Sequence, residues 1–202
     1  MTMISHKYKF VFLANQKCAS TTLHELLRPY SDKCFTIWIY QKPLGTHSDA
    51  KTVKKYLEKR GCKWEDYFVF TTIREPMSRI RSCFRYESDF SKNRDLTDLI
   101  RPIPKDFKKY VMGDWFLKRF RDITDFVSDK EGNCLVDKII KVEELDETMP
   151  DILNKLGIPI DWDKITSMNM TSKNKVLEFD DEMTRHLRSY NFTDFNYYKS
   201  DA

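Results

Sequence analysis

Glycine is scarce in this chain. It occurs five times among 202 residues, and none lies between Met1 and Leu44. The phosphate loop of ATP and GTP enzymes needs two glycines separated by four residues, followed by Lys and Ser or Thr. That loop is therefore excluded from the N-terminal region. Proline occurs only seven times, and this low Pro and Gly content argues against long flexible linkers.

Paired cysteines and long apolar runs are lacking as well. The cysteines are odd in number and scattered, with no CxxC spacing typical of zinc or redox sites: Cys18, Cys34, Cys62, Cys83 and Cys134. Such a set favours a reducing compartment. No apolar run reaches the length of a membrane span, and the first nine residues contain no signal-peptide core. We therefore expect a cytoplasmic protein with no membrane span and no metal site.

The composition that remains is that of a globular protein. Hydrophobic residues make up 41% of the chain and charged residues 33%, and 202 residues suffice for one domain with a sizeable core. The net charge of +4 is too small to indicate nucleic-acid binding by itself, although it suits an anionic ligand. We expect a single domain over residues 1–202 that binds no nucleic acid.

Residues 10–27 are the most informative stretch. They begin with apolar and aromatic residues typical of a buried strand, turn through a polar segment with Lys17, and continue as a helix with apolar positions at Leu23, Leu26 and Leu27. Hydroxyls at Ser20, Thr21 and Thr22 can cap that helix. The helix N-terminus and Lys17 would attract phosphate. The alternative is an ordinary strand–helix unit with a hydroxyl cap.

Two more strands and a helix complete a pattern of alternating elements. Residues 35–40 and 67–73 read as strands, and Asp49 can cap a helix that Gly61 ends. This order predicts a three-layer α/β fold with a central parallel sheet flanked by helices. Ligands bind such sheets beyond the carboxyl ends of the strands, where Lys17 and the turn after Ile73 are expected.

The C-terminal half is predicted with less regular patterns. Helices are expected over 105–112, 114–121, 146–156 and 180–190, and the turn at 128–133 indicates a strand pair over 123–127 and 135–142. Residues 161–175 read as a loop. The aromatic residues at the end are expected to pack against the domain: Phe192, Phe195, Tyr197 and Tyr198.

The turn after the third predicted strand is rich in arginine. Arg74 follows a strand that should be buried, where an unpaired charge is costly. Its partner can be Glu75, Asp49 or a ligand phosphate. Pro76 suits the first turn of a helix, and three further arginines follow on it: Arg79, Arg81 and Arg85. The alternative interpretation of this run is a solvated basic helix.

Together the two turns resemble the sulfotransferase superfamily, in particular its carbohydrate-type (family 2) members. The second turn matches their Arg-x-Pro-x-x-Arg-x-x-Ser segment in full, as Arg74-Glu75-Pro76-Met77-Ser78-Arg79-Ile80-Arg81-Ser82. The first corresponds to their lysine-containing turn, Gln16-Lys17-Cys18-Ala19-Ser20-Thr21-Thr22, although many relatives carry Gly or Asn near the lysine. The resemblance extends from Lys9 to Tyr198 and implies a P-loop-like fold.

The resemblance implies an enzyme that uses 3′-phosphoadenosine 5′-phosphosulfate (PAPS) as sulfuryl donor, releases adenosine 3′,5′-bisphosphate and needs no metal. Lys17 would neutralise charge on the leaving oxygen, and Arg74 with Ser82 would bind the 3′-phosphate. The 5′-phosphosulfate would be bound by Lys17, Cys18, Ala19, Ser20, Thr21 and Thr22. The acceptor would be a hydroxyl of a carbohydrate or small molecule.

The family places a catalytic base near the loop after the second strand, which makes His47 the candidate. Glu87 or Asp89 is the alternative base, and a loop-packing role is the alternative for His47. Two other functions stay open at this point. A nucleotide or nucleoside kinase would need a glycine-rich loop and a magnesium-binding aspartate, and a nucleic-acid or anion-binding module would need exposed arginines over 74–85.

Overall fold

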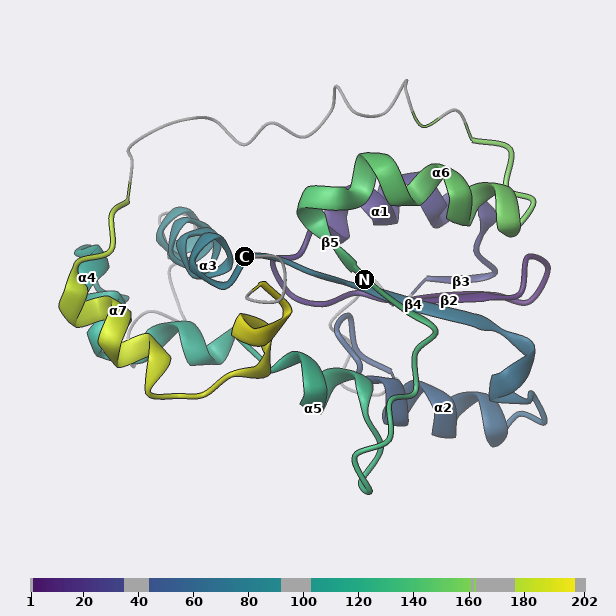
Figure 1. Ribbon diagram of the computed structural model, residues 1–202. Coiled ribbons are helices and arrows are strands. Elements are labelled where there is room, and N and C mark those ends of the chain that lie inside the picture. Colours follow the sequence, from purple (N-terminus) through teal and green to yellow (C-terminus); the bar gives the residue numbers. More distant parts are fainter. Residues whose placement is uncertain (1, 35–43, 92–102, 161, 163–176, 199–202) are drawn as a thin grey trace. The chain divides into compact units, whose positions relative to one another are not determined.

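The computed structural model describes residues 2–34, 44–91, 103–160, 162 and 177–198. Its internal contacts divide the chain into two compact units. Unit 1 contains residues 1–74 and 123–171, and unit 2 contains residues 75–122 and 172–202. Unit 1 carries the sheet, and the described part of unit 2 is helical (Figure 1).

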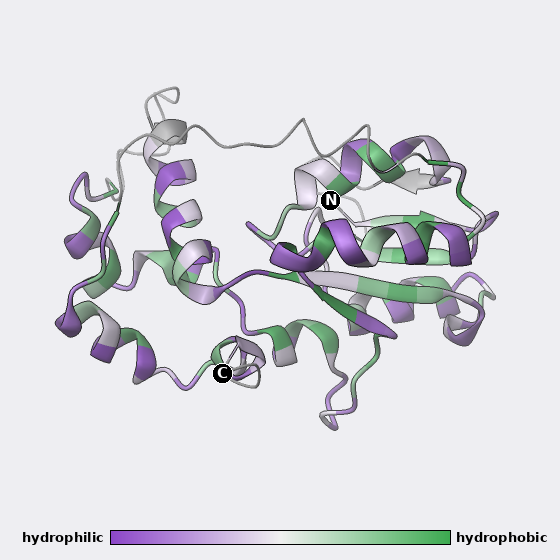
Figure 2. Cartoon of the chain, turned by 45° about the horizontal axis from the view of Figure 1, so that its top comes forward, coloured by the Kyte–Doolittle hydropathy of each residue, from purple (hydrophilic) through white to green (hydrophobic). Residues whose placement is uncertain are grey.

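The sheet of unit 1 has five strands in the order β3-β1-β2-β4-β5. Their bounds are β1 Met3–Ser5, β2 Phe10–Leu13, β3 Lys33–Cys34, β4 Phe68–Ile73 and β5 Lys138–Lys141. Strands β2, β4 and β5 are parallel, whereas β1 is antiparallel to both β2 and β3. The β2 strand is fully buried, as expected of a strand covered on both faces. Figure 2 shows that the strands are predominantly hydrophobic.

Helices cover both faces of this sheet (Figure 1). Helices α1 (Ser20–Leu27) and α6 (Leu145–Lys155) lie on one face, and α2 (Ala50–Glu58) and α5 (Ile123–Val127) lie on the other. The core beneath α1 and α6 is built from apolar side chains of these helices and of β2, β4 and β5. The predicted three-layer α/β fold is thus confirmed.

Several predicted elements of unit 1 are confirmed at residue level. Strands β2 and β4 occupy the expected segments, and α2 begins after Asp49, whose carboxylate accepts a hydrogen bond from the Thr52 N–H at 2.8 Å. Helix α6 occupies the predicted 146–156 segment within one residue at each end. The predicted strand at 35–40 and most of the predicted loop at 161–175 lie outside the described residues.

One predicted element of unit 1 was wrong, and one strand was missed. Residues 123–127 form helix α5 instead of a strand. The segment is only five residues long, and its apolar positions Ile123, Phe126 and Val127 fit the helical spacing as well as a short strand pattern. The sequence reasoning also missed β1, whose three residues are too few to show a period. The other half of the predicted strand pair, residues 135–142, does contain a strand, β5.

Unit 2 has its own apolar core. Its elements are α3 (Pro76–Ser91), α4 (Phe107–Met112), α7 (Asp181–Arg188) and two 3-10 segments, η3 (Trp115–Lys118) and η7 (Thr193–Tyr198). Residues 114–121 were expected to be one helix, but only the short η3 forms there. Phe192 and Phe195 pack against the core of this unit, as predicted for the aromatic tail, whereas Tyr197 is exposed. Within the described residues, every helix is too short or too polar to cross a membrane.

Candidate functional site

The carboxyl edge of the sheet in unit 1 brings together segments that are distant in sequence. Strands β2 and β4 are parallel neighbours, with Leu13 opposite Thr71. The turn after β2 and Arg74 after β4 therefore leave the sheet at the same edge. This is the edge at which open α/β sheets bind ligands.

The turn between β2 and α1 has an unusual backbone. Lys17 and Ala19 both adopt positive φ angles, 62° and 55°, although neither is glycine. Residues in this left-handed conformation between right-handed ones turn successive N–H groups toward a common point, which suits an anion. The turn thus reaches its conformation without a glycine.

The predicted hydroxyl cap of α1 was wrong. The N-cap residue is Ala19, and Ser20 is already the first helical residue. Among the described residues, no side chain caps α1, and its first turn contains no acidic residue. The reason is the left-handed Ala19, which places the three hydroxyls inside the first turn. Ser20 and Thr22 are half-buried there and Thr21 is exposed.

Four other helices begin with a carboxylate that accepts a hydrogen bond from a backbone N–H of the first turn. These are α2, α3, α4 and α7, with caps at Asp49, Glu75, Asp106 and Asp180. A carboxylate cap neutralises the positive end of the helix dipole. Helix α1 has no such cap, so no carboxylate neutralises the positive end of its dipole. A helix end of this kind suits an external anion.

Buried hydrogen bonds tie this turn to β4. The Thr72 hydroxyl donates to the Cys18 carbonyl at 2.6 Å, and the Asn15 amide donates to the Thr72 carbonyl at 3.2 Å. Thr72, Asn15 and Cys18 are all buried, so the position of the turn is set from the neighbouring strand. The sequence reasoning missed Thr72 and Asn15. Two threonines at the end of an otherwise apolar strand were the available signal, because a buried hydroxyl needs a partner.

His47 also lies against this turn. Its Nδ1 is 2.7 Å from the Ala14 carbonyl oxygen. A carbonyl oxygen can only accept a hydrogen bond, so Nδ1 carries the hydrogen and Nε2 of the neutral ring carries the lone pair. In its neutral form the ring would then have the tautomer that a general base requires.

Arg74 keeps a buried donor for a further partner. Its side chain is half-buried, and its Nε is buried with no hydrogen-bond acceptor among the described residues. The two carboxylates that could have paired with it, Glu75 and Asp49, cap α3 and α2 instead. A buried unsatisfied N–H is costly. An anionic ligand is the alternative partner that the sequence suggested for Arg74.

The arginine-rich helix α3 of unit 2 is not a solvated basic face. Arg79 is fully buried and pairs with Asp194, and the Arg81 Nε donates to the Leu177 carbonyl at 2.7 Å. Ser82 lies half-buried on the same helix. The nucleic-acid alternative required exposed arginines in this segment, whereas Arg79 is buried and Arg74, Arg81 and Arg85 are half-buried.

Glu87, the alternative base, belongs to a buried network in unit 2. Its carboxylate accepts hydrogen bonds from the Tyr110 hydroxyl at 2.9 Å and from the Arg119 Nε at 3.1 Å. Burial is the main cause that raises the pKa of Tyr110. These contacts give Glu87 a structural role. The side chain of the other alternative, Asp89, lies outside the described residues.

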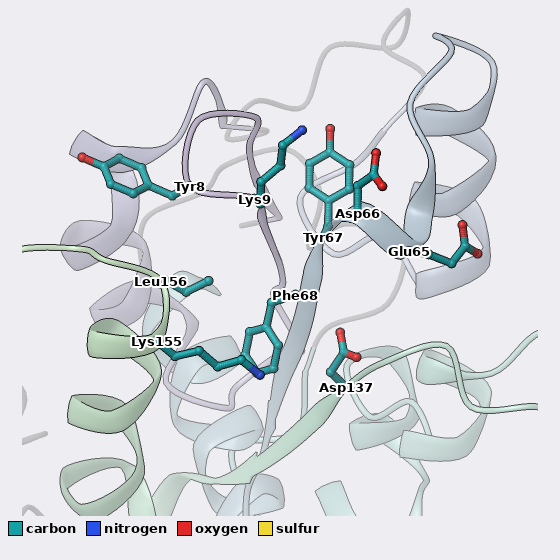
Figure 3. A pocket seen from close by; sticks show the side chains of 9 residues that line it. All are labelled: Tyr8, Lys9, Glu65, Asp66, Tyr67, Phe68, Asp137, Lys155 and Leu156. Carbon is teal, nitrogen blue, oxygen red and sulfur yellow. The ribbon is translucent and has the colours of Figure 1, made fainter.

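A separate depression of about 360 Å³ lies at the opposite, amino edge of the sheet (Figure 3). Two of the charged side chains that line it, Lys155 and Asp137, have partners within the chain. The Lys155 Nζ is 4.1 Å from the Phe68 ring centroid, and the Asp137 carboxylate accepts a hydrogen bond from the Val69 N–H at 2.7 Å. It contains neither Lys17 nor Arg74. No cluster of metal-binding side chains occurs in the parts of the chain that the structure describes.

Comparison with known proteins agrees with this geometry. The chain matches the sulfotransferase family over residues 1–200. No curated protein sequence matches it significantly. Among solved structures, it is similar to mouse sulfotransferase SULT7A1 complexed with PAP, at a TM-score of 0.55 and 14% identity, covering 95% of this chain and 86% of that one. At this identity the structural likeness shows a shared fold. Because the family match spans nearly the whole sequence, the chain belongs to the sulfotransferase family.

Proposed function

We propose that the protein transfers the sulfuryl group of PAPS to a hydroxyl of a carbohydrate or small-molecule acceptor and releases adenosine 3′,5′-bisphosphate. One observation carries the proposal. The turn with Lys17, the helix end of α1 without a carboxylate cap and Arg74 with its buried Nε donor all lie at one edge of the sheet. A donor with phosphates at both ends requires such separate anion-binding groups.

The first turn is assigned to the 5′-phosphosulfate end. The α1 backbone N–H groups and the hydroxyls of Ser20, Thr21 and Thr22 would bind the phosphate, because these residues form the first turn of the helix, at the positive end of its dipole. Lys17 would neutralise the charge that develops on the leaving oxygen. Cys18 and Ala19 contribute through their backbone: the Cys18 carbonyl holds the turn on β4, and Ala19 starts the helix.

Arg74 and Ser82 are assigned to the 3′-phosphate on the basis of the family motif. A guanidinium offers a planar fork of donors that matches phosphate oxygens, which a lysine does not. The N-terminus of α3 is capped by the Glu75 carboxylate. Because that helix end is neutralised, the side chains of Arg74 and Ser82, and not the helix N-terminus, would bind this phosphate.

His47 is assigned as the base that takes the proton from the acceptor hydroxyl. Its Nδ1–H donates to the Ala14 carbonyl, which orients the ring and leaves the lone pair on Nε2. General base catalysis typically contributes roughly 10²–10⁴-fold to a rate. A purely structural His47 would contribute nothing at this step.

Ligand binding tests the donor assignment. Isothermal titration should show tight binding of adenosine 3′,5′-bisphosphate, weaker binding of adenosine 5′-phosphate and no requirement for magnesium. Arg74→Lys should lower the affinity for the bisphosphate by about tenfold, since a single ammonium cannot replace the guanidinium fork. The affinity for adenosine 5′-phosphate, which lacks the 3′-phosphate, should stay unchanged. A protein that binds ATP with magnesium but not the bisphosphate would contradict the proposal.

Turnover tests the base. His47→Ala should retain bisphosphate affinity and lose at least about 100-fold in transfer of labelled sulfate from PAPS. His6→Ala is the matched control, because the His6 ring contacts the Tyr67 hydroxyl and not the Ala14 carbonyl. Full activity of the His47 variant would exclude it as the base. The same labelled-donor assay, applied to a panel of sugars and small hydroxyl compounds, identifies the acceptor.

A further inference from the structure

We propose that the buried ion pair of Arg79 and Asp194 positions Ser82 for the 3′-phosphate of the donor. Arg79 is part of the arginine motif, but it is a positioning residue and not a phosphate ligand. The proposal rests on the proposed function, because Ser82 has this role only if the donor carries a 3′-phosphate. All three residues belong to unit 2.

The geometry of the pair is that of a fixed anchor. The Arg79 Nη1 lies 2.8 Å from the Asp194 Oδ1, and both side chains are 0% exposed. The same nitrogen donates to the Arg121 carbonyl at 3.2 Å. The guanidinium carbon is 4.3 Å from the centroid of the Phe120 ring. No solvent reaches this arginine, so it is unavailable to a ligand phosphate.

Stability alone is a weak reason for such a pair. Removing two charges from water is costly, and apolar residues of similar volume often stabilise a fold as well or better. A hydrogen-bonded pair differs from an apolar contact in being directional. It fixes the rotation of a helix and its position along its own axis, whereas apolar side chains tolerate a slide.

The same constraint fixes the position of Ser82. It follows Arg79 by three residues, so the two are neighbours on the surface of α3. Farther along, Glu87 ties the same helix to Tyr110 and Arg119. Ser82 therefore lies between two buried polar anchors. A misplacement of about 1 Å can reduce catalysis by about 100-fold, so such anchoring is functionally important.

The carboxylate partner is itself held in place. Asp194 lies in η7, where the preceding Thr193 N–H donates to the Asp122 carboxylate at 2.6 Å. The ring of Phe192 lies 4.8 Å from that of Phe120 and stacks on Tyr190. These contacts within unit 2 hold in place the η7 carboxylate that pairs with Arg79.

The test compares two ligands that differ only in the 3′-phosphate. In Asp194→Asn, affinity for adenosine 3′,5′-bisphosphate should fall about tenfold, equivalent to about 1.4 kcal/mol. Affinity for adenosine 5′-phosphate should stay within about twofold, because that ligand does not use Ser82. An equal loss of affinity for both ligands in a variant that still folds would overturn the proposal, because a merely structural role of the pair would affect both ligands alike. Asp180→Asn, which alters an exposed helix cap in the same unit, should change neither affinity.

A double variant identifies Ser82 as the group through which the pair acts. Ser82→Ala alone should lower only the affinity for the bisphosphate. Adding Asp194→Asn should lower this affinity little further, since the effects of substitutions at residues that act as one unit do not add. Fully additive losses would overturn the proposal. Arg79→Lys, which retains the charge but loses the guanidinium geometry, should show the same ligand selectivity to a smaller extent. It decides the question if Asp194→Asn does not fold.

The outcomes separate this inference from the proposed function. If the unaltered protein does not bind the bisphosphate, or if Ser82→Ala leaves both affinities unchanged, the assignment of the 3′-phosphate fails and the inference fails with it. If Ser82→Ala lowers only the affinity for the bisphosphate, but Asp194→Asn and Arg79→Lys do not lower that affinity selectively, the inference is wrong and the proposed function still stands.

Discussion

Thr72→Val should loosen the phosphate-binding turn without changing the shape of the core. Valine has nearly the volume of threonine but cannot donate a hydrogen bond. In the structure the buried Thr72 hydroxyl donates to the Cys18 carbonyl at 2.6 Å, and this bond ties the turn to β4. The substitution removes that bond from a site that solvent does not reach.

The expected magnitude follows from that burial. Loss of a buried hydrogen-bond partner costs about 1–3 kcal/mol. For a chain of this length each kcal/mol shifts the melting temperature by roughly 2–4 °C, so Thr72→Val should melt at least about 2 °C lower. Since the turn carries Lys17, affinity for adenosine 3′,5′-bisphosphate should also fall, by about fivefold or more, which is about 1 kcal/mol.

Thr71→Val is the matched control. The Thr71 hydroxyl is equally buried and donates to the Leu13 carbonyl at 2.7 Å, within the β2–β4 pair and not in the turn. Both variants should lose similar stability in thermal melts, but only Thr72→Val should lose affinity in isothermal titration. Equal affinities in the two variants would refute the view that β4 positions the turn through this bond.

Three further substitutions test the turn and helix α1. Ala19→Gly should raise the free energy of unfolding by about 0.5–1 kcal/mol, because Ala19 has φ 55° and a left-handed alanine is strained. The control Ala50→Gly, at the start of α2, should lower the free energy of unfolding. If urea melts show that both variants lose the same stability, the argument is contradicted. Lys17→Ala should reduce turnover far more than bisphosphate affinity, whereas equal losses would argue against a role at the leaving oxygen. Burial lowers the pKa of His24 from 6.5, so the unfolded chain binds a proton more readily and stability should fall as the pH drops below about 6.5. His24→Gln should reduce that dependence in urea melts at pH 7.5 and 5.5, and an unchanged dependence would contradict the argument.

Local patterns predicted the elements that carry strong local signals. The apolar runs at β2 and β4, the Asp49 cap of α2 and the end of α6 before Gly157 were all predictable, because each depends on neighbouring residues. The segment 123–127 was predicted wrongly because five residues fit either period. The cap of α1 was predicted wrongly because nothing in the sequence marks a left-handed Ala19.

The sequence by itself determined the chemistry: a lysine turn after one strand, an arginine motif after another, and the family to which both belong. Only the tertiary structure decided which of those groups are available to a ligand. It paired Arg79 with Asp194, 115 residues away, oriented His47 on the Ala14 carbonyl and left the Arg74 Nε without an acceptor among the described residues. The physical reason is that a buried polar group must be satisfied by whatever the fold brings near it, and residues far apart along the chain carry no local sign of that pairing.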